Sequence, residues 1–410
     1  MKILIVGAGG REHAIGRELL KNTRVHQLYF APGNGGTARM GENIPIYDIK
    51  SFCKFAEKQQ VDLTIVGSEP FLAKGIVDVF QAAGLKIFGP DLRSARLESS
   101  KVSAKSFMKK YGVRTAAHQS FSNHAEALNH LSQVNYPLVI KASGLASGKG
   151  VVITKNLSEA RSTLDAMMEK KIFGASGCEV VIEEFLEGYE ASILSIFNGK
   201  CIVPFLSAKD HKKIGEGEQG FNTGGMGAIA PNPYITDEIW VDFQRNILQP
   251  TLKGLLAEGW IFSGVVFFGL MLTAKGIYLL EYNLRMGDPE TQVLLPLMES
   301  DLLELIEKAL HGEDFSISWK KAYSCCVVVA SKGYPEKYEK GKIISGLDLL
   351  ECPYYVAGAQ RIDHQWITSG GRVLNVVGIG NSAQAARQSA YREVEKISFD
   401  GAYFRKDIGL

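Results

Sequence analysis

Short apolar runs alternate with amphipathic stretches through residues 1–100. The apolar runs predict strands at 2–6, 27–30, 63–66 and 86–88, and the stretches between them predict helices at 12–21 and 71–83. Strands that alternate with helices in this way favour a parallel sheet with crossover helices. The start of the chain therefore predicts an α/β domain.

The rest of the chain follows a more mixed pattern. A helix is expected at 101–111 because Gly112 follows its last periodic position. Residues 122–190 predict a smaller unit of helices and strands around a glycine-rich loop. Strands at 263–272 and 277–285 flank a turn at 274–276, and residues 329–410 mix strands with a helix near 383–396. We expect a multidomain α/β protein (α+β in part) that ends in a small separate α+β lobe.

Composition limits the partners that the protein can have. The chain has 410 residues and a formal net charge of +2, which is too close to balance to indicate binding to nucleic acid or a membrane surface. Its six cysteines show no CxxC spacing, which suits a reducing cytosol. No apolar run approaches the roughly 18 residues that would span a bilayer. We expect a cytoplasmic monomer.

The first glycine-rich turn resembles a dinucleotide-binding fingerprint in its position. Gly7, Gly9 and Gly10 lie between the first strand and the first helix, but Glu12 stands where the third glycine is needed. The second strand ends in the glycine-rich segment 31–36 and not in an acidic residue. An NAD-dependent oxidoreductase is therefore disfavoured. A tight turn and a phosphate site at the helix N-terminus both remain open.

A second glycine-rich loop, 142–150, follows Lys141 at the end of an apolar strand. It is not a P-loop, because only three residues separate Gly144 from Gly148 and a strand, not a helix, follows Gly150. Strand, loop and strand predict a hairpin tip whose backbone N–H groups can fold over phosphates. A flexible hairpin with solvated lysines is the alternative.

The segment 277–292 carries residues typical of a metal site. Strict alternation along a strand predicts one apolar face made of Tyr278, Leu280, Tyr282 and Leu284, and an opposite face made of Leu279, Glu281, Asn283 and Arg285. Carboxylate and amide oxygens are the ligands that Mg²⁺ prefers, and a guanidinium can neutralise a transferring phosphoryl group. A strand with a hydrated polar face is the alternative.

Sequence blocks spread along the whole chain occur together in one known family. They are GGREHA (9–14), APGNGG (31–36), GSEPFL (67–72), FGP (88–90), IKASGLASGKGVV (140–152), EEFLEGYEAS (183–192), NTGGMGA (222–228) and EYNLRMGDPETQ (281–292). In this set and order the chain resembles the phosphoribosylamine–glycine ligases of the ATP-grasp superfamily. The resemblance implies a Rossmann-like N-terminal domain at 1–102, a large ATP-grasp subdomain with the metal site at 103–121 plus 191–328, a lid subdomain at 122–190 and a C-terminal domain at 329–410.

The resemblance also implies roles for particular residues. ATP would be held by Lys105, Lys141, Lys149, Glu183, Glu184, Leu186 and Glu190, and a Mg²⁺ or Mn²⁺ ion by Glu281 and Asn283. The implied catalytic residues are Arg285, Lys141 and Asp210. The substrates would contact Gly9, Gly10, Arg11, Glu12, Asn34, Gly35, Asp210, Gly224, Gly225, Met226 and Asp288.

The implied reaction joins glycine to 5-phospho-D-ribosylamine through glycyl phosphate and yields glycinamide ribonucleotide, ADP and phosphate. The 144–150 loop would close as a lid that protects the acyl phosphate from water. No covalent nucleophile is needed, and His13 and His211 are the nearest general-base candidates. Another ATP-grasp carboxylate–amine ligase and a non-catalytic nucleotide-binding regulator are the competing hypotheses.

Overall fold

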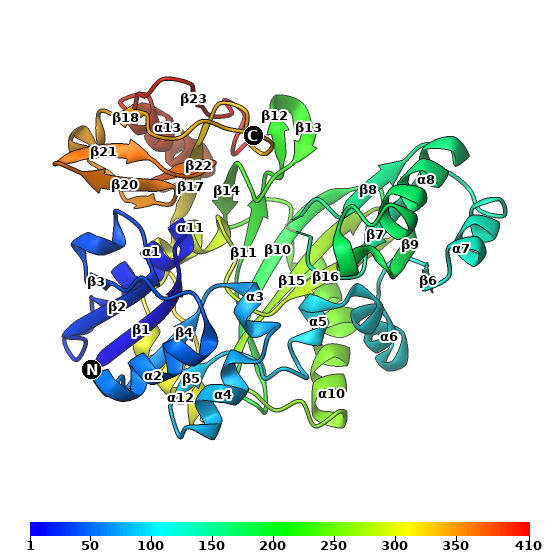
Figure 1. Cartoon of the computed structure of the whole chain (residues 1–410), viewed down its shortest axis with the longest axis horizontal. Coiled ribbons are helices and arrows are strands. Elements are labelled where there is room, and N and C mark those ends of the chain that lie inside the picture. The colour runs from blue at the N-terminus through cyan, green and yellow to red at the C-terminus, as the bar shows by residue number, and fades with distance from the viewer. Residues whose placement is uncertain (147) are drawn as a thin grey trace.

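The computed structural model describes residues 1–146 and 148–410. Its N-terminal part is a parallel sheet with strand order β3-β2-β1-β4-β5 (Figure 1). These strands are β1 (Lys2–Gly7), β2 (Gln27–Pro32), β3 (Glu42–Asn43), β4 (Leu63–Val66) and β5 (Ile87–Phe88). The parallel sheet predicted from the alternating pattern is confirmed.

The helices of this part mostly follow the prediction, with one difference. They are α1 (Gly10–Leu19), η1 (Thr37–Arg39), α2 (Ile49–Gln59), α3 (Glu69–Leu72), α4 (Ile76–Ala82) and α5 (Arg96–Ser99). The single helix predicted over 71–83 is wrong, because the chain divides it into α3 and α4. Gly75 lies at the break with a left-handed φ of 77°, which interrupts helical hydrogen bonding.

Helix α6 (Lys101–Tyr111) confirms the predicted start and end signals. The Ser100 side chain accepts a hydrogen bond from the backbone N–H of Ser103, and Gly112 ends the helix in the left-handed conformation. An antiparallel sheet of order β6-β9-β7-β8 follows and is drawn in teal at the right of Figure 1. Its elements are β6 (His118–Phe121), α7 (His124–Leu131), β7 (Leu138–Ala142), β8 (Val151–Thr154), α8 (Leu157–Leu164), η2 (Asp165–Glu169), η3 (Gly174–Gly177) and β9 (Val180–Glu184).

A large sheet of order β16-β15-β10-β11-β14-β17-β22-β19 runs through the centre of the molecule, and β23 pairs with β17. Its strands are β10 (Tyr189–Phe197), β11 (Ile202–Asp210), β14 (Gly227–Ala230), β15 (Gly264–Thr273), β16 (Gly276–Asn283), β17 (Tyr323–Ser331), β19 (Tyr354–Val356), β22 (Arg372–Gly380) and β23 (Ala402–Tyr403). Strand β17 crosses the boundary predicted at 328/329. The expected separate C-terminal lobe therefore shares its main sheet with the preceding region, and the domain division stays a prediction.

Helices and small sheets cover this central sheet. The helical elements are η4 (Glu216–Glu218), α9 (Asp237–Phe243), η5 (Gln244–Leu248), α10 (Gln249–Ala257), α11 (Glu290–Leu294), η6 (Leu295–Leu297), α12 (Leu302–Leu310), η7 (Leu347–Leu349) and α13 (Ala383–Val394). The small sheets are the hairpin of β12 (Lys213–Gly215) with β13 (Gln219–Asn222), and the group of β18 (Ile343–Ile344), β20 (Ala359–Ile362) and β21 (Gln365–Thr368). No helix in the described part of the chain combines the length and apolar character that crossing a membrane requires.

Strand β16 departs from strict alternation. Gly269 of β15 pairs with Glu281, but the next residue, Leu270, pairs with Leu279, so Leu280 is an extra residue in a β-bulge. The bulge turns Leu279 into the core, where it is fully buried, and leaves Leu280 half-buried beside the cavity described below. The predicted faces are therefore wrong for Tyr278, Leu279 and Leu280, because Ile277 and Leu279 are the core residues before the bulge.

A close contact between β22 and α13 predicts the effect of a small substitution. A Cβ atom on Gly378 would lie 2.2 Å from the backbone O of Ala386 and from the backbone N of Ala390. Gly378→Ala should lower the free energy of unfolding by about 1–3 kcal/mol, because helix backbone cannot move aside as a side chain can. Denaturant unfolding measures the loss. Gln388→Ala, at an exposed position of the same helix, is the control and should change stability by less than about 0.5 kcal/mol. Equal losses for both variants would contradict this account of the packing.

Candidate active site

A cavity of about 920 Å³ lies where the N-terminal sheet, α6, the β6–β9 sheet and the central sheet meet. The turn after β1 lies along one side, and residues of β7, β9 and β16 line other parts of it. Tyr334 and Arg372 reach it from the C-terminal region. A cavity of this size suits small-molecule ligands.

Three buried charged side chains form the core of the predicted nucleotide site. The Glu183 carboxylate lies between two ammonium groups, with its Oε1 3.1 Å from Nζ of Lys105 and its Oε2 2.9 Å from Nζ of Lys141. Burial lowers the pKa of Lys105 to about 8, although Glu183 opposes the shift. Burial alone would raise the pKa of Glu183, but Lys141 and Lys105 hold it below its ordinary value. The two lysines thus bring one positive charge more than Glu183 neutralises.

Glu281 and Asn283 line the cavity on the same side as Lys141. Within the described residues no hydrogen bond or ion pair engages the Glu281 carboxylate, and its pKa is lowered by Lys212, Lys101 and Lys141 in spite of its burial. This free anionic oxygen pair, beside the Asn283 amide oxygen, fits a hard divalent cation. The described residues hold no cluster of three or more His, Cys, Asp or Glu that could bind a metal alone. A cation here would take its remaining ligands from phosphate and water.

Arg285 follows Asn283 by two residues, and its guanidinium lies close to two carboxylates. Its Nε is 3.3 Å from Oε1 of Glu98 and 3.5 Å from Oε2 of Glu69, and its Nη2 donates to Oδ1 of Asn283 at 3.3 Å. Burial raises the pKa of Glu98 even though Arg285 opposes it. These contacts hold the guanidinium at the cavity wall beside the possible metal ligands.

The other residues expected to hold ATP also reach the cavity. Glu184, Leu186, Glu190 and Lys149 are among the residues that line it. Oε2 of Glu190 is 2.7 Å from Nζ of Lys212, and Oε1 of Glu184 accepts a hydrogen bond from the backbone N–H of Ala117 at 2.8 Å. Of the loop predicted to close at 144–150, residue 147 lies outside the described residues, while Ala146 and Gly148 line the cavity on either side of it.

Asp210, Asp288 and Gly224 also line the cavity. Oδ1 of Asp210 is buried without a hydrogen-bond partner among the described residues, and burial, with the nearby Glu290 carboxylate, raises the pKa of Asp210. Asp288 is paired, because its Oδ1 lies 3.3 Å from Nη1 of Arg372. The unpaired oxygen of Asp210 is therefore available to an amine or hydroxyl donor of a ligand.

The first glycine-rich turn is stabilised mainly from within. The backbone N–H of Gly9 donates to Oε2 of Glu12 at 2.6 Å, and Oε1 of Glu12 accepts from Nε of Arg11 at 2.6 Å. Gly9, Arg11 and Glu12 line the cavity. Because Glu12 already engages the Gly9 N–H group, the structure favours the tight-turn interpretation at this position over a free phosphate-binding N–H.

Some residues that the resemblance implicated in substrate binding do not line the cavity: Gly10, Asn34, Gly35, Gly225 and Met226. Nδ2 of Asn34 donates to the backbone O of Ala8 at 2.9 Å and of Val356 at 2.8 Å, so this side chain joins the N-terminal sheet to the C-terminal region. Gly35 donates its N–H to the backbone O of Ala359 at 2.9 Å. Met226 is fully buried in the C-terminal core. In this structure Asn34 and Gly35 therefore join the N-terminal sheet to the C-terminal region.

The two histidines named as general-base candidates are not lining residues either. Nδ1 of His13 accepts a hydrogen bond from the backbone N–H of Val356 at 2.8 Å, and burial lowers the pKa of His13 to about 4. Nδ1 of His211 lies 3.2 Å from Oε1 of Glu218, away from the cavity.

Other lining residues were missed by the sequence analysis, among them Lys101, Lys212, Lys213, Tyr334 and Arg372. Lys101 could have been found, since it precedes Lys105 by one helical turn and shares its face of α6. The sequence around Arg372 contains no motif that indicates a binding residue. Its Nη1 donates to the backbone O of Gly224 at 2.6 Å and of Asp288 at 2.8 Å, both distant in sequence.

Comparison with protein-family models finds three matches, of which the first two adjoin and the third begins after a gap at 292–323. The N domain of phosphoribosylglycinamide synthetase matches residues 1–98, its ATP-grasp (A) domain matches 99–291, and its C domain matches 324–410. Two similar relatives are phosphoribosylamine–glycine ligases. The one from Fusobacterium nucleatum is 53% identical, covering 100% of this chain and 98% of the relative, and the one from Clostridium acetobutylicum is 52% identical, covering 100% and 99%.

Solved structures agree with these matches. A phosphoribosylamine–glycine ligase from Thermotoga maritima superposes with a TM-score of 0.89 at 35% identity and covers 100% of both chains. The biotin carboxylase domain of a 2-oxoglutarate carboxylase from Hydrogenobacter thermophilus superposes with a TM-score of 0.74 at 16% identity, over 98% of this chain and 91% of the other, which shows a shared fold only. With family models matching residues 1–291 and 324–410 and relatives more than half identical over the whole chain, the chain belongs to the phosphoribosylamine–glycine ligase family, also called phosphoribosylglycinamide synthetase.

Proposed function

We propose that this protein uses ATP to join glycine to 5-phospho-D-ribosylamine and forms glycinamide ribonucleotide, ADP and phosphate, the second step of de novo purine biosynthesis. The observation that carries the proposal is the match over the full chain to ligases named for this reaction. The cavity supports it, because two buried lysines, a candidate metal site and an unpaired carboxylate oxygen line the same cavity.

The chemistry needs an activated carboxylate, because the oxygen of a free carboxylate is too basic to leave. The γ-phosphoryl group of ATP is transferred to glycine, and the amine of phosphoribosylamine then displaces phosphate from glycyl phosphate. In this proposal Lys105 and Lys141 would hold the nucleotide phosphates, and Arg285 would neutralise charge on the transferring group; their positions in the cavity wall support these roles. Asp210 would orient an amine through its unpaired oxygen.

An ATP-grasp enzyme uses ATP with a divalent cation, and we propose Glu281 and Asn283 as its ligands here. The free carboxylate of Glu281 and the absence of any larger acidic cluster among the described residues support Mg²⁺ or Mn²⁺ bound jointly with phosphate. The cation would supply charge neutralisation at the β- and γ-phosphates.

We further propose that the protein acts as a monomer in the cytoplasm, on small molecules and without a nucleic-acid or membrane partner. The near-neutral net charge of +2 supports the part of this proposal that concerns nucleic acid and membranes, and the free cysteines support a reducing compartment.

Glycine-dependent ADP release tests the proposed function. With ATP, Mg²⁺ and freshly made phosphoribosylamine, ADP should form with glycine and at background rate with alanine or serine, because a site shaped for the smallest amino acid excludes a side chain. A coupled ADP assay measures the rate, and mass spectrometry identifies the amide product. Faster turnover with another carboxylate would support a different ATP-grasp ligase, and ATP binding without turnover of any carboxylate would support a regulator.

Removal of the proposed metal ligand should lower the turnover rate strongly while the protein still folds. Glu281→Gln should lower kcat on the order of 100-fold, since a bound cation supplies several kcal/mol of charge stabilisation, and should weaken Mn²⁺ binding measured by electron paramagnetic resonance. Glu313→Gln, at an exposed surface position, is the matched control and should behave as the unmodified protein. Undiminished Mn²⁺ binding by Glu281→Gln would show that the cation lies elsewhere.

The pKa of Lys105 predicts a pH dependence. Since burial lowers this pKa to about 8 in the free protein, the ammonium loses its proton as pH rises through that value and phosphate binding weakens. The ratio kcat/KM for ATP, which reports on free enzyme, should therefore fall above about pH 8. Lys105→Arg keeps its charge and should move the falling limb to higher pH, whatever its effect on the maximum. Identical falling limbs for both proteins would assign the titration to another group.

A further inference from the structure

The β12–β13 hairpin delivers side chains to the cavity without belonging to the large sheet. Its two strands pair only with each other among the described residues. Lys212 and Lys213 at its start and Asn222 at its end line the cavity. A two-stranded hairpin alone is marginally stable in water, so this one needs contacts from elsewhere to hold its side chains in place.

The tip of the hairpin has an unfavourable backbone. Gly217 and Glu218 both have left-handed conformations, with φ values of 63° and 57°. This conformation is sterically unfavourable for a non-glycine residue such as Glu218, because its Cβ crowds the backbone. The tip is also exposed, so burial of apolar surface does not offset that cost. An external partner must stabilise it.

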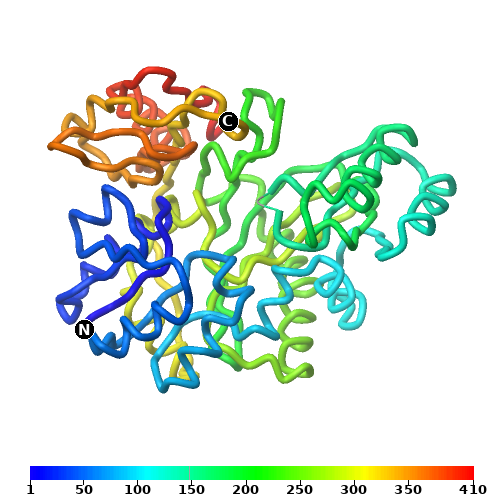
Figure 2. Tube along the Cα trace, viewed as in Figure 1, coloured from blue at the N-terminus to red at the C-terminus, as the bar shows by residue number. Residues whose placement is uncertain are grey.

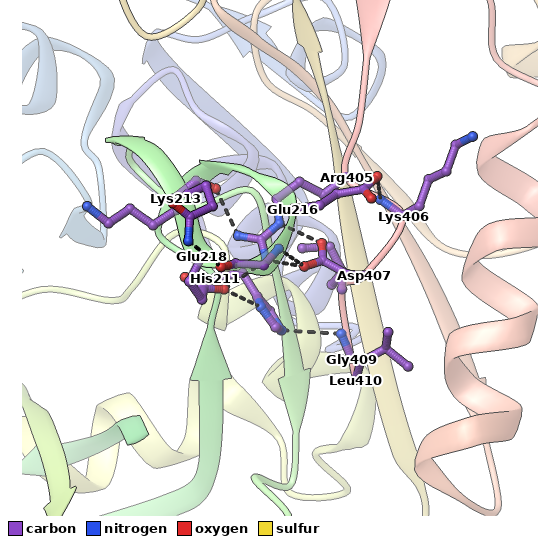
Figure 3. A network of polar contacts seen from close by, with 12 residues as sticks. His211, Lys213, Glu216, Glu218, Arg405, Lys406, Asp407, Gly409 and Leu410 are labelled. Carbon is purple, nitrogen blue, oxygen red and sulfur yellow. Dashed lines mark hydrogen bonds and ion pairs between the residues drawn. The ribbon is translucent and has the colours of Figure 1, made fainter. Parts of the chain in front are cut away.

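That partner is the C-terminal tail, residues 403–410, which lies beside the hairpin (Figure 2). Arg405 is only 1% exposed, and its guanidinium makes several hydrogen bonds. Its Nη1 donates to the backbone O of Lys213 at 2.9 Å, and its Nη2 donates to Oε1 of Glu218 at 2.8 Å (Figure 3). Its Nε and Nη2 also contact the two carboxylate oxygens of Asp407 at 2.7 Å each. One planar guanidinium thus joins the base of the hairpin to its tip.

Backbone contacts reinforce this connection. The N–H of Gly217 donates to Oδ2 of Asp407 at 2.8 Å, and the N–H of Lys406 donates to Oε1 of Glu216 at 3.1 Å. Tyr403 adds a hydrogen bond from its Oη to the backbone O of Ile214 at 2.8 Å. The tail therefore contacts both the β12 strand and the turn.

His211 extends the network to the residues beside the cavity. Its Nε2 accepts a hydrogen bond from the backbone N–H of Gly409 at 3.2 Å, so the ring hydrogen must lie on Nδ1, which donates to Oε1 of Glu218 at 3.2 Å. The neighbours of His211 in sequence, Asp210 and Lys212, both line the cavity. Figure 3 shows His211, Glu218, Arg405 and Asp407 in one connected set of contacts.

We propose that the C-terminal tail is a clasp, and that Arg405 is a positioning residue that holds the β12–β13 hairpin so that Lys212 reaches the Glu190 carboxylate in the nucleotide-binding part of the cavity. The 2.7 Å contact between Lys212 and Glu190 is the link from the hairpin to the site. The inference rests on the proposed function in one respect, because it takes the ligand near Glu190 to be ATP.

Replacement of Arg405 by methionine tests the clasp. Arg405→Met should raise KM for ATP about tenfold, the effect of losing one well-placed charged hydrogen bond, with a smaller change in kcat. It should also weaken binding of a non-hydrolysable ATP analogue, measured by calorimetry. Cleavage by a lysine-specific protease after Lys212 and Lys213 should become faster. Arg405→Lys should recover part of the affinity, because one ammonium keeps the charge but reaches fewer of the acceptors.

Lys342→Met is the matched control. Lys342 pairs with Asp400 at 2.7 Å in the same C-terminal region and makes no contact with the hairpin among the described residues. It should leave KM for ATP and hairpin cleavage unchanged.

The opposing outcome is that Arg405→Met lowers only the melting temperature and leaves KM, analogue affinity and the cleavage rate unchanged. That result would contradict the clasp proposal and show that Arg405 has a merely structural role. If Arg405→Met does not fold, Glu218→Gln at the exposed tip decides in the same way, with the same direction expected. Analogue binding and cleavage do not need turnover. They therefore decide the clasp even if the unmodified protein shows no glycine-dependent ADP release, a result that would count against the proposed function alone.

Discussion

The cavity depends on one arrangement of buried charges, in which the Glu183 carboxylate lies between the ammonium groups of Lys105 and Lys141. Each of these charges would be costly to bury without a partner. They come from α6, β7 and β9, so the cost is avoided only when the β6–β9 sheet and α6 are docked against each other. The two lysines share a single carboxylate, so the site keeps one net positive charge before any ligand binds. That charge favours the binding of phosphate.

The parts of this arrangement that the sequence predicted are those controlled by local rules. Helix α6 follows from an N-cap serine and a terminal glycine, and the parallel sheet follows from alternating apolar and amphipathic stretches. Local rules failed at β16, where the bulge at Leu280 shifted Leu279 into the core. Bulges are set by how two strands pair, which a strand's own residues do not reveal. Glu281 and Asn283 stayed on the cavity side because the bulge lies before both of them.

Long-range contacts account for the other differences. Family resemblance pointed to the segment that contains Asn34, but the hydrogen bonds of this side chain reach Val356 in the C-terminal region and leave no group for the cavity. Arg372 shows the opposite case, because a strand residue without any motif around it arrives at the cavity through the sheet. The resemblance indicated which segments of the chain contribute to the site. Which side chain of each segment faces the cavity depends on how distant segments pack together.

The C-terminal region, whose role the sequence left open, contributes to the site by two routes. Strand β22 belongs to the central sheet and brings Arg372 directly to the carbonyl groups of Gly224 and Asp288. The tail acts indirectly through Arg405, which is bonded to a hairpin that lies outside that sheet. Hydrogen bonds within the central sheet fix the position of Arg372, whereas the position of the hairpin depends on a few charged contacts with Arg405. Ile214 packs the hairpin against the C-terminal core, and in the proposed clasp the charge pairing at the tip sets how firmly Lys212 contacts Glu190.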